Sequence, residues 1–277
     1  MASHALMPLP ASLIAELLAL GVVAGFLAGL LGVGGGMLLV PFLTLILSNR
    51  GVAPDLAVKM AIATSMATIF FTSLSSLRAH QQQGAVRWDL VRGLAPGIVA
   101  GGLVSGAGAF AALKGQGLAL LFAAVVGHAA LRMLQDRPPA PGRRMPGWAG
   151  QAAAGFGIGF ISGLVGAGGA FLSVPFMTRG NVPLRQAVAT SAALGFPIAL
   201  ANTAGYLVGG WSLAPALPGA FGYLYLPALA IIALASVSLA PLGARTSHRI
   251  DVRLLRKIFA ALLFALAVSM LWRVFSV

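Results

Sequence analysis

One glycine-rich stretch of this sequence occurs twice, and the repeat limits what the chain can fold into. The first copy, GFLAGLLGVGGGMLLVPF, covers residues 25–42, and the second, GFISGLVGAGGAFLSVPF, covers residues 159–176. Shifted by 134 positions, from 25 to 159, the copies match at most of their glycines and at the closing Val-Pro-Phe. A repeat of this kind indicates that the two halves of the chain fold alike.

Each copy predicts a helix that breaks at the glycines and resumes as a short apolar helix containing a proline. Consecutive glycines weaken a helix, permit a sharp turn and leave backbone N–H groups open to a ligand. The helix that follows starts with partial positive charge at its N-terminus. Two broken helices in one apolar chain are typical of transporters built from internal repeats, in which the broken helices form the binding site.

The composition places this chain in a membrane. Of 277 residues, 59% are hydrophobic and 8% are charged, and the mean hydropathy is +0.95. The absence of cysteine excludes disulfides and cysteine-bound metals. A net charge of +13 would indicate nucleic acid binding in a soluble protein, but here we expect loop charges that set topology and contact anionic lipid, and no nucleic acid partner. No Lys or Arg precedes the first apolar run, so a cleaved signal peptide is not expected.

The sequence predicts an all-α polytopic membrane protein with two inverted repeats, each a re-entrant hairpin broken at glycines plus three transmembrane helices. The second arm of the first hairpin, residues 37–47, would rise only ~17 Å against a hydrocarbon core of ~30 Å. The first membrane repeat is residues 1–134, a basic, Pro-rich cytoplasmic linker is residues 135–148, and the second repeat is residues 149–277. The predicted hairpins are 11–48 and 149–178, and the predicted spans are 57–78, 90–112, 116–134, 187–208, 220–243 and 254–274.

The positions of Lys and Arg predict the orientation. With re-entrant hairpins, fourteen of the 18 fall on one face, and the other face keeps Arg50, Lys59, Lys114 and Arg273. If each broken helix crossed once, the repeats would be parallel and the split would be ten against eight, which is no bias. The positive-inside rule therefore favours inverted repeats in a bacterial-type inner membrane, with both termini extracytoplasmic and the glycine turns meeting near the midplane.

The doubled glycine signature, the Ala-Thr-Ser at 63–65 and 189–191, and the basic linker resemble the TauE/SafE family of membrane permeases, grouped with toluene-sulfonate uptake proteins. The resemblance covers nearly the whole chain. It implies a small oxyanion as substrate, sulfite or an organosulfonate such as sulfoacetate. The second copy has Ala167 and Ala170 where the first has Val33 and Gly36, so the two turns need not bind ligand equally.

Hydroxyl and amide donors near the turns suit an oxyanion, which offers only acceptors. The candidate substrate-binding residues are Gly34, Gly35, Gly36, Thr64, Ser65, Gly168, Gly169, Thr190, Ser191 and Asn202, and the candidate hinges are Gly32, Pro41, Gly166 and Pro175. Two alternatives stay open: the glycines only let helices pack closely, and the hydroxyls only bond carbonyls of their own helices. For the glycines we expect Gly35→Val to abolish transport and Gly29→Ala to be milder.

No catalytic set and no metal spacing occurs, so we expect no enzyme, no cofactor and no metal. His80 and His248 fall in basic loops and are expected to be solvated. Among five acidic residues only Glu16 falls inside an apolar segment, which favours anion export driven by membrane potential over proton coupling. An uptake permease for a related sulfonate or other small anion, and a non-transporting scaffold subunit, are the alternatives. The sequence leaves open the anion, the direction, any coupling ion and homo-oligomerisation.

Overall fold

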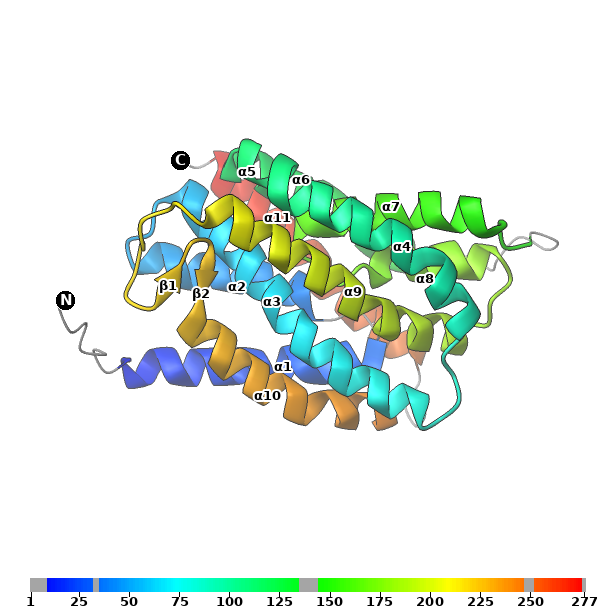
Figure 1. Cartoon of the computed structure of the whole chain (residues 1–277). Coiled ribbons are helices and arrows are strands. Elements are labelled where there is room, and N and C mark those ends of the chain that lie inside the picture. Colours follow the sequence, from blue (N-terminus) through cyan, green and yellow to red (C-terminus); the bar gives the residue numbers. More distant parts are fainter. Residues whose placement is uncertain (1–8, 32–34, 135–143, 247–251, 276–277) are drawn as a thin grey trace.

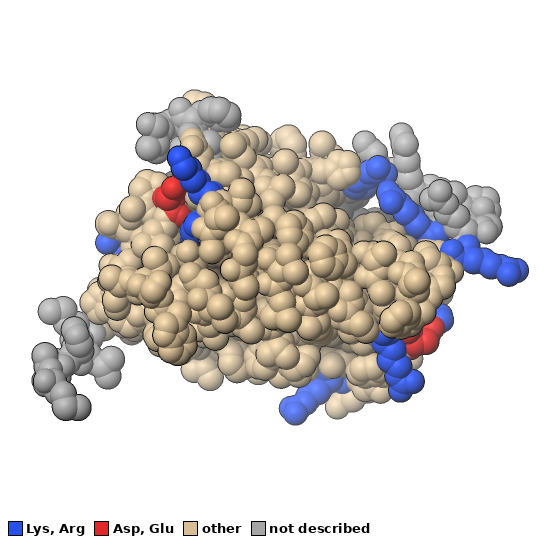
Figure 2. Space-filling view, turned by 45° about the horizontal axis from the view of Figure 1, so that its top comes forward, with Lys and Arg blue, Asp and Glu red and all other residues tan. Residues whose placement is uncertain are grey.

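The computed structural model describes residues 9–31, 35–134, 144–246 and 252–275, and nearly all of them are helical (Figure 1). Within this described part, seven helices are long and apolar enough to cross a membrane. The predicted all-α polytopic fold is confirmed. Lys and Arg gather toward the two ends of the face in Figure 2, and a broad band of other residues separates them, as expected for a belt facing lipid.

The helices of the first half follow the predicted order. They are α1 (Ala11–Leu31), α2 (Gly36–Asn49), α3 (Pro54–Gln81), α4 (Trp88–Val104), α5 (Phe110–Ala112) and α6 (Gly115–Leu134). A π-helical turn, η1 (Ser105–Ala109), joins α4 to α5, so the predicted span 90–112 is one helix with a local irregularity.

The second half has the same order with one addition. Its elements are α7 (Trp148–Val165), α8 (Ala170–Arg179), α9 (Leu184–Gly210), β1 (Ala220–Phe221), β2 (Leu224–Tyr225), α10 (Leu226–Thr246) and α11 (Val252–Phe275). The predicted span 220–243 is wrong at its start, because β1 and β2 form a small antiparallel hairpin there. Gly219 and Gly222 hold left-handed conformations, with φ of 83° and 55°, that interrupt a helix.

In the first half, α1 and α2 lie antiparallel as a hairpin. Leu13 and Leu17 near the start of α1 belong to the same buried cluster as Leu43 and Leu47 near the end of α2. The 14 residues of α2 rise ~21 Å and the 10 of α8 ~15 Å, so neither crosses a ~30 Å core alone. In contrast, α1 and α7 are long enough to cross. The depth of the glycine turns in the membrane stays a prediction.

The first helix of each half packs against the other half, α1 on α10 and α7 on α4. A Cβ placed on Gly25 would lie 2.6 Å from the Ser236 carbonyl oxygen, and one on Gly159 would lie 2.9 Å from the Cα of Ile98. Glycines therefore bring these helices together at the level of the backbone. The two halves interlock.

The same contacts show the helix directions. On α1, Gly21 lies beside Ile232 and Gly29 beside Ala240, so α1 runs parallel to α10. By the same reasoning α7 runs parallel to α4, because Gly155 lies beside Leu94 and Gly159 beside Ile98.

At the centre, α3 and α9 cross antiparallel. Phe70 of α3 contacts Phe196 of α9, with ring centroids 5.0 Å apart, and Ser73, further along α3, lies beside the preceding residue of α9, Gly195. The start of α1 and the end of α11 lie at one end of the molecule, and the α3–α4 and α8–α9 loops lie at the other (Figure 1). Corresponding helices of the two halves therefore run in opposite directions.

This arrangement predicts which loops share a side of the membrane. Since the chain has no cysteine, single cysteines at Arg144, before α7, and at Ser212, after α9, can report it with an impermeant thiol reagent on intact cells. We expect labelling at Ser212 only, and labelling at Arg144 after the membrane is permeabilised. Labelling of both in intact cells would contradict the orientation.

The glycine contacts predict large stability effects. The expectation that Gly29→Ala is milder than Gly35→Val for transport stays a prediction, but its effect on stability is expected to be large, because the new Cβ would overlap the backbone of Ala240. Gly29→Ala and Gly155→Ala should each destabilise the protein by about 1–3 kcal/mol, as overpacking does. The control is Gly157→Ala on α7, where nothing lies within 4 Å of the Cβ position. Thermal unfolding in detergent should show a lower midpoint for Gly29→Ala and Gly155→Ala than for the unchanged protein. The midpoint of the control should be unchanged.

Candidate functional site

The two glycine turns meet in the interior. Gly35, Gly166 and Gly169 have φ of 71°, 72° and 75°, so all three occupy the left-handed region that favours glycine. At the start of α2, Gly36 packs against the Gly166 carbonyl oxygen, and α8 begins directly after Gly169. The predicted hinge Gly32 and site residue Gly34 lie outside the described residues. The start of α2 thus lies directly against the second turn.

A small cavity lies beside the second turn, between α1, α3 and α9. Its volume is about 10 Å³, room for about one water molecule. It is lined by Ala28, Thr72, Ser73, Ser76, Gly168, Ser191, Ala192 and Gly195. Hydroxyl groups therefore face a backbone turn from which a helix N-terminus starts.

The hydroxyls of the cavity differ in how they are bonded. Thr72 and Ser73 each donate a 3.1 Å hydrogen bond to a carbonyl oxygen of their own helix. Such a local bond competes with other partners of the hydroxyl, including a ligand. Ser191 accepts a 3.0 Å hydrogen bond from Ser173 of α8. The Ser76 hydroxyl is buried and has no hydrogen-bond partner in the part of the chain that the structure describes. It is the donor most readily offered to a ligand.

The cavity contains two residues predicted from the sequence, Gly168 and Ser191, and three that were missed, Thr72, Ser73 and Ser76. A signal for two of them was present. Hydroxyl residues occur at every fourth position of α3, at 64, 68, 72 and 76, and this spacing places them on one helix face. All four are buried.

The predicted residues Thr64 and Thr190 make equivalent contacts, outside the cavity. Thr64 Oγ1 accepts a 3.0 Å hydrogen bond from the backbone N–H of Tyr225, just before α10. Thr190 Oγ1 accepts a 3.0 Å bond from the N–H of Arg87, just before α4. Each threonine therefore satisfies an N–H group at the start of a helix from the opposite half.

Comparison with known proteins decides the family. The model of the sulfite exporter TauE/SafE family matches residues 17–270. The chain belongs to this family. A probable membrane transporter protein of Haemophilus influenzae is 33% identical over 91% of this chain and 96% of its own length. Another, from Methanocaldococcus jannaschii, is 27% identical over 92% and 94%. No solved structure matches significantly.

The resemblance found in the sequence is thus confirmed, and this TauE/SafE family member is a membrane transporter. The remaining predicted site residues lie in its interior. Ser65 and Asn202 are fully buried. The Asn202 amide donates to the Ile198 carbonyl at 2.8 Å, and the Tyr206 hydroxyl donates to the carbonyl of Gly163 on α7. The candidate hinges Pro41 and Pro175 lie inside α2 and α8.

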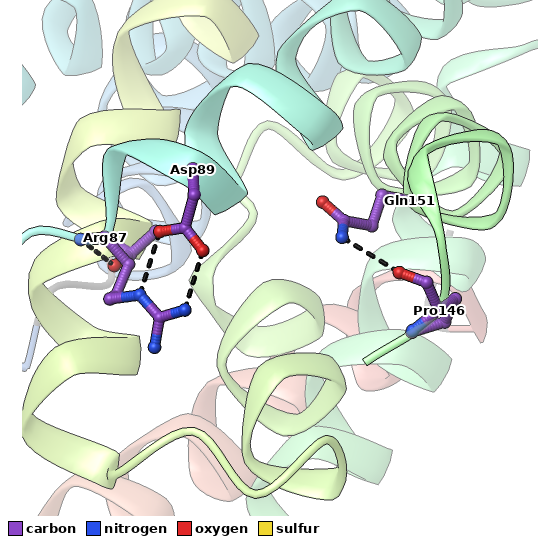
Figure 3. Close-up of polar contacts among 5 residues, drawn as sticks. Arg87, Asp89, Pro146 and Gln151 are labelled. Carbon is purple, nitrogen blue, oxygen red and sulfur yellow. Dashed lines mark hydrogen bonds and ion pairs between the residues drawn. The ribbon is translucent and has the colours of Figure 1, made fainter. Parts of the chain in front are cut away.

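At the end of the TauE/SafE protein that carries the α3–α4 loop, Arg87 binds Asp89 through two hydrogen bonds of 2.8 and 2.6 Å (Figure 3). The hydrogen bond to Asp89 raises the pKa of the Arg87 guanidinium, so this arginine stays charged. The expectation for His80 is wrong: it lies in the last turn of α3 and is 3% exposed, because α3 extends beyond the predicted end at residue 78. His248 lies outside the described residues.

The threonine contacts predict a structural cost that is separate from binding. Thr64→Val leaves the buried N–H of Tyr225 without its acceptor, and Thr190→Val does the same to the part-buried N–H of Arg87. Thr64→Val should destabilise this TauE/SafE protein by about 1–3 kcal/mol, and Thr190→Val by less. Thr246→Val is the control, since its hydroxyl is exposed and bonds only its own helix. Unfolding midpoints in detergent measure the difference. Equal stability of all three variants would contradict the capping role.

Proposed function

We propose that this transporter exports a small oxyanion, sulfite or an organosulfonate, through the cavity between α3 and α9. The observation that carries the proposal is the cavity itself, where buried hydroxyls face the turn that starts α8. Membership of the sulfite exporter TauE/SafE family supports the choice of anion.

The chemistry of the cavity lining suits an anion. Serine and threonine hydroxyls donate hydrogen bonds, and an oxyanion accepts them. The first N–H groups of α8 lack acceptors within their own helix and carry partial positive charge. Polar, uncharged surroundings of this kind are expected to distinguish an oxyanion from a cation of similar size.

Neutral donors also set the affinity. The residues that line the cavity include no Lys or Arg. A helix N-terminus contributes ~0.3–1 kcal/mol when exposed and up to ~2 kcal/mol when partly buried, which offsets only part of the cost of dehydrating an anion. Moderate affinity and fast release follow, and these suit the clearance of an abundant metabolite.

Export requires no coupling ion in this scheme. The cavity lining contains no acidic residue, and an inside-negative potential of 100 mV contributes ~2.3 kcal/mol per charge to the exit of an anion. The cavity has room for only about one water molecule, so an oxyanion enters when helices around it separate. The opposite directions of the two halves support inverted repeats that alternate between two openings.

The test is sulfite flux through liposomes that contain only the purified protein. We expect sulfite flux down its gradient, and we expect this flux to stop when an imposed membrane potential opposes the movement of the anion. Ser76→Ala removes the unbonded donor and should raise the Kd for sulfite by about tenfold or more, since a hydrogen bond to a charged group contributes ~1.5–3 kcal/mol. Ser238→Ala, exposed on α10, is the matched control. Absence of flux would favour a scaffold, and unchanged binding by Ser76→Ala would exclude this cavity.

A further inference from the structure

The cavity residues have counterparts in the other half of the chain. A shift of 134 relates the hairpins, and a shift of 126 relates α3 to α9, as Thr64 to Thr190 shows. The structure agrees with the second shift, because Thr64 and Thr190 each accept a hydrogen bond from the backbone N–H of the residue before a helix of the opposite half. The counterparts of Ala28, Ser76 and Ser191 are Ser162, Asn202 and Ser65.

All three counterparts are polar, and each has a buried polar atom with no hydrogen-bond partner among the described residues. These atoms are Ser65 Oγ, Ser162 Oγ and Asn202 Oδ1, and all three residues are 0% exposed. A buried polar atom without a partner destabilises a fold and calls for an explanation. The two serine hydroxyls can donate to an oxyanion, whereas Asn202 Oδ1 only accepts and the Asn202 amide nitrogen donates to the carbonyls of Ile198 and Gly159.

A fourth atom of this kind adjoins them. Ser105 Oγ has no partner among the described residues, and like Asn202 Oδ1 it lies within 2.5 Å of where a Cβ on Gly163 would be. Ser105 begins the π-helical turn η1, and single π-helical turns occur frequently at functional sites.

Apolar side chains fill the mirrored position in this conformation. The counterparts of Ala192, Gly195 and Thr72, which leave the cavity open, are Met66, Ile69 and Ile198. The Cδ1 of Ile198 lies against Gly169, and Ser162 Oγ is 3.1 Å from where a Cβ on Gly169 would be. The Cδ1 of Ile69 lies against Gly36. These long side chains can change rotamer.

The two positions lie on opposite sides of the crossing of α3 and α9. Ser76 lies toward the C-terminal end of α3, and Asn202 lies toward the C-terminal end of α9. Since the two helices are antiparallel, these ends point to opposite faces. In this conformation the first position keeps a small cavity, and the second is filled by side chains.

We infer that Ser65 and Ser162, with Asn202 beside them, form a second binding position for the transported oxyanion, in which the serine hydroxyls are the donors, and that it opens toward the opposite face when the cavity at Ser76 closes. The inference rests on the proposed function, because it places a second step on the same path. Serine hydroxyls can donate to the anion, and in this conformation they lack partners because the anion position is collapsed. Movement of Ile69 and Ile198 away from the glycine turns opens it.

Thiol labelling during transport tests the inference, since the chain has no native cysteine. Ser76→Cys and Ser162→Cys are treated with an impermeant thiol reagent in right-side-out and inside-out membrane vesicles. We expect Ser76→Cys to react from one face and Ser162→Cys from the other, and saturating sulfite to protect both. The control is Ser236→Cys, buried at the α1–α10 contact and bonded to the Gly21 carbonyl, which should not react.

Sulfite flux is measured in the same vesicles, so that the two proposals fail separately. Vesicles without flux would overturn the proposed function. Flux with Ser162→Cys unreactive from both faces, or reactive from the same face as Ser76→Cys, would overturn the second position. Ser65→Cys repeats the test at the counterpart of Ser191, in case Ser162→Cys does not fold.

Discussion

A membrane interior offers no water to backbone polar groups, and this constraint governs the whole structure. A helix that ends inside the membrane leaves N–H or C=O groups that only protein can satisfy or shield. Here the start of α2 lies against the carbonyl of Gly166, so the second glycine turn shields the first break. The crossing of α3 and α9, with the α1–α10 and α7–α4 pairs beside it, encloses both breaks.

The contacts between the halves divide the molecule into parts that move together. Backbone-level contact at Gly25 and Gly159 holds α1 close to α10 and α7 close to α4. A displacement of α10 therefore carries α1 with it. Thr64 and Thr190 connect these pairs to α3 and α9. Opening of the cavity is then expected to require movement of these helix pairs relative to one another, together with the flexible side chains around the turns.

Periodicity and composition were enough to predict the helices and their order, because long apolar segments separated by polar loops have few alternatives in a membrane. The family was predicted from a resemblance, carried by the doubled glycine motif and the two Ala-Thr-Ser segments. The cavity was only partly predictable. Thr64 follows the glycine motif in sequence and shares a face of α3 with Ser76, but packing decides which level of that face borders the cavity, and Thr72, Ser73 and Ser76 lie at that level. Burial of His80 depends on neighbours from distant segments in the same way. The β1–β2 hairpin escaped prediction because its residues are as apolar as the helix that follows.

The exchange of helices between halves also affects how the protein is made. Synthesis produces α1 first, yet its main partner α10 begins only at Leu226. Until then the glycine face of α1, shaped to touch another backbone, contacts lipid or other protein, and the first half alone has no surface that fits it. The last stage of folding must therefore wait for nearly the whole chain, and a product truncated after the linker would retain an unmatched helix that quality control can recognise.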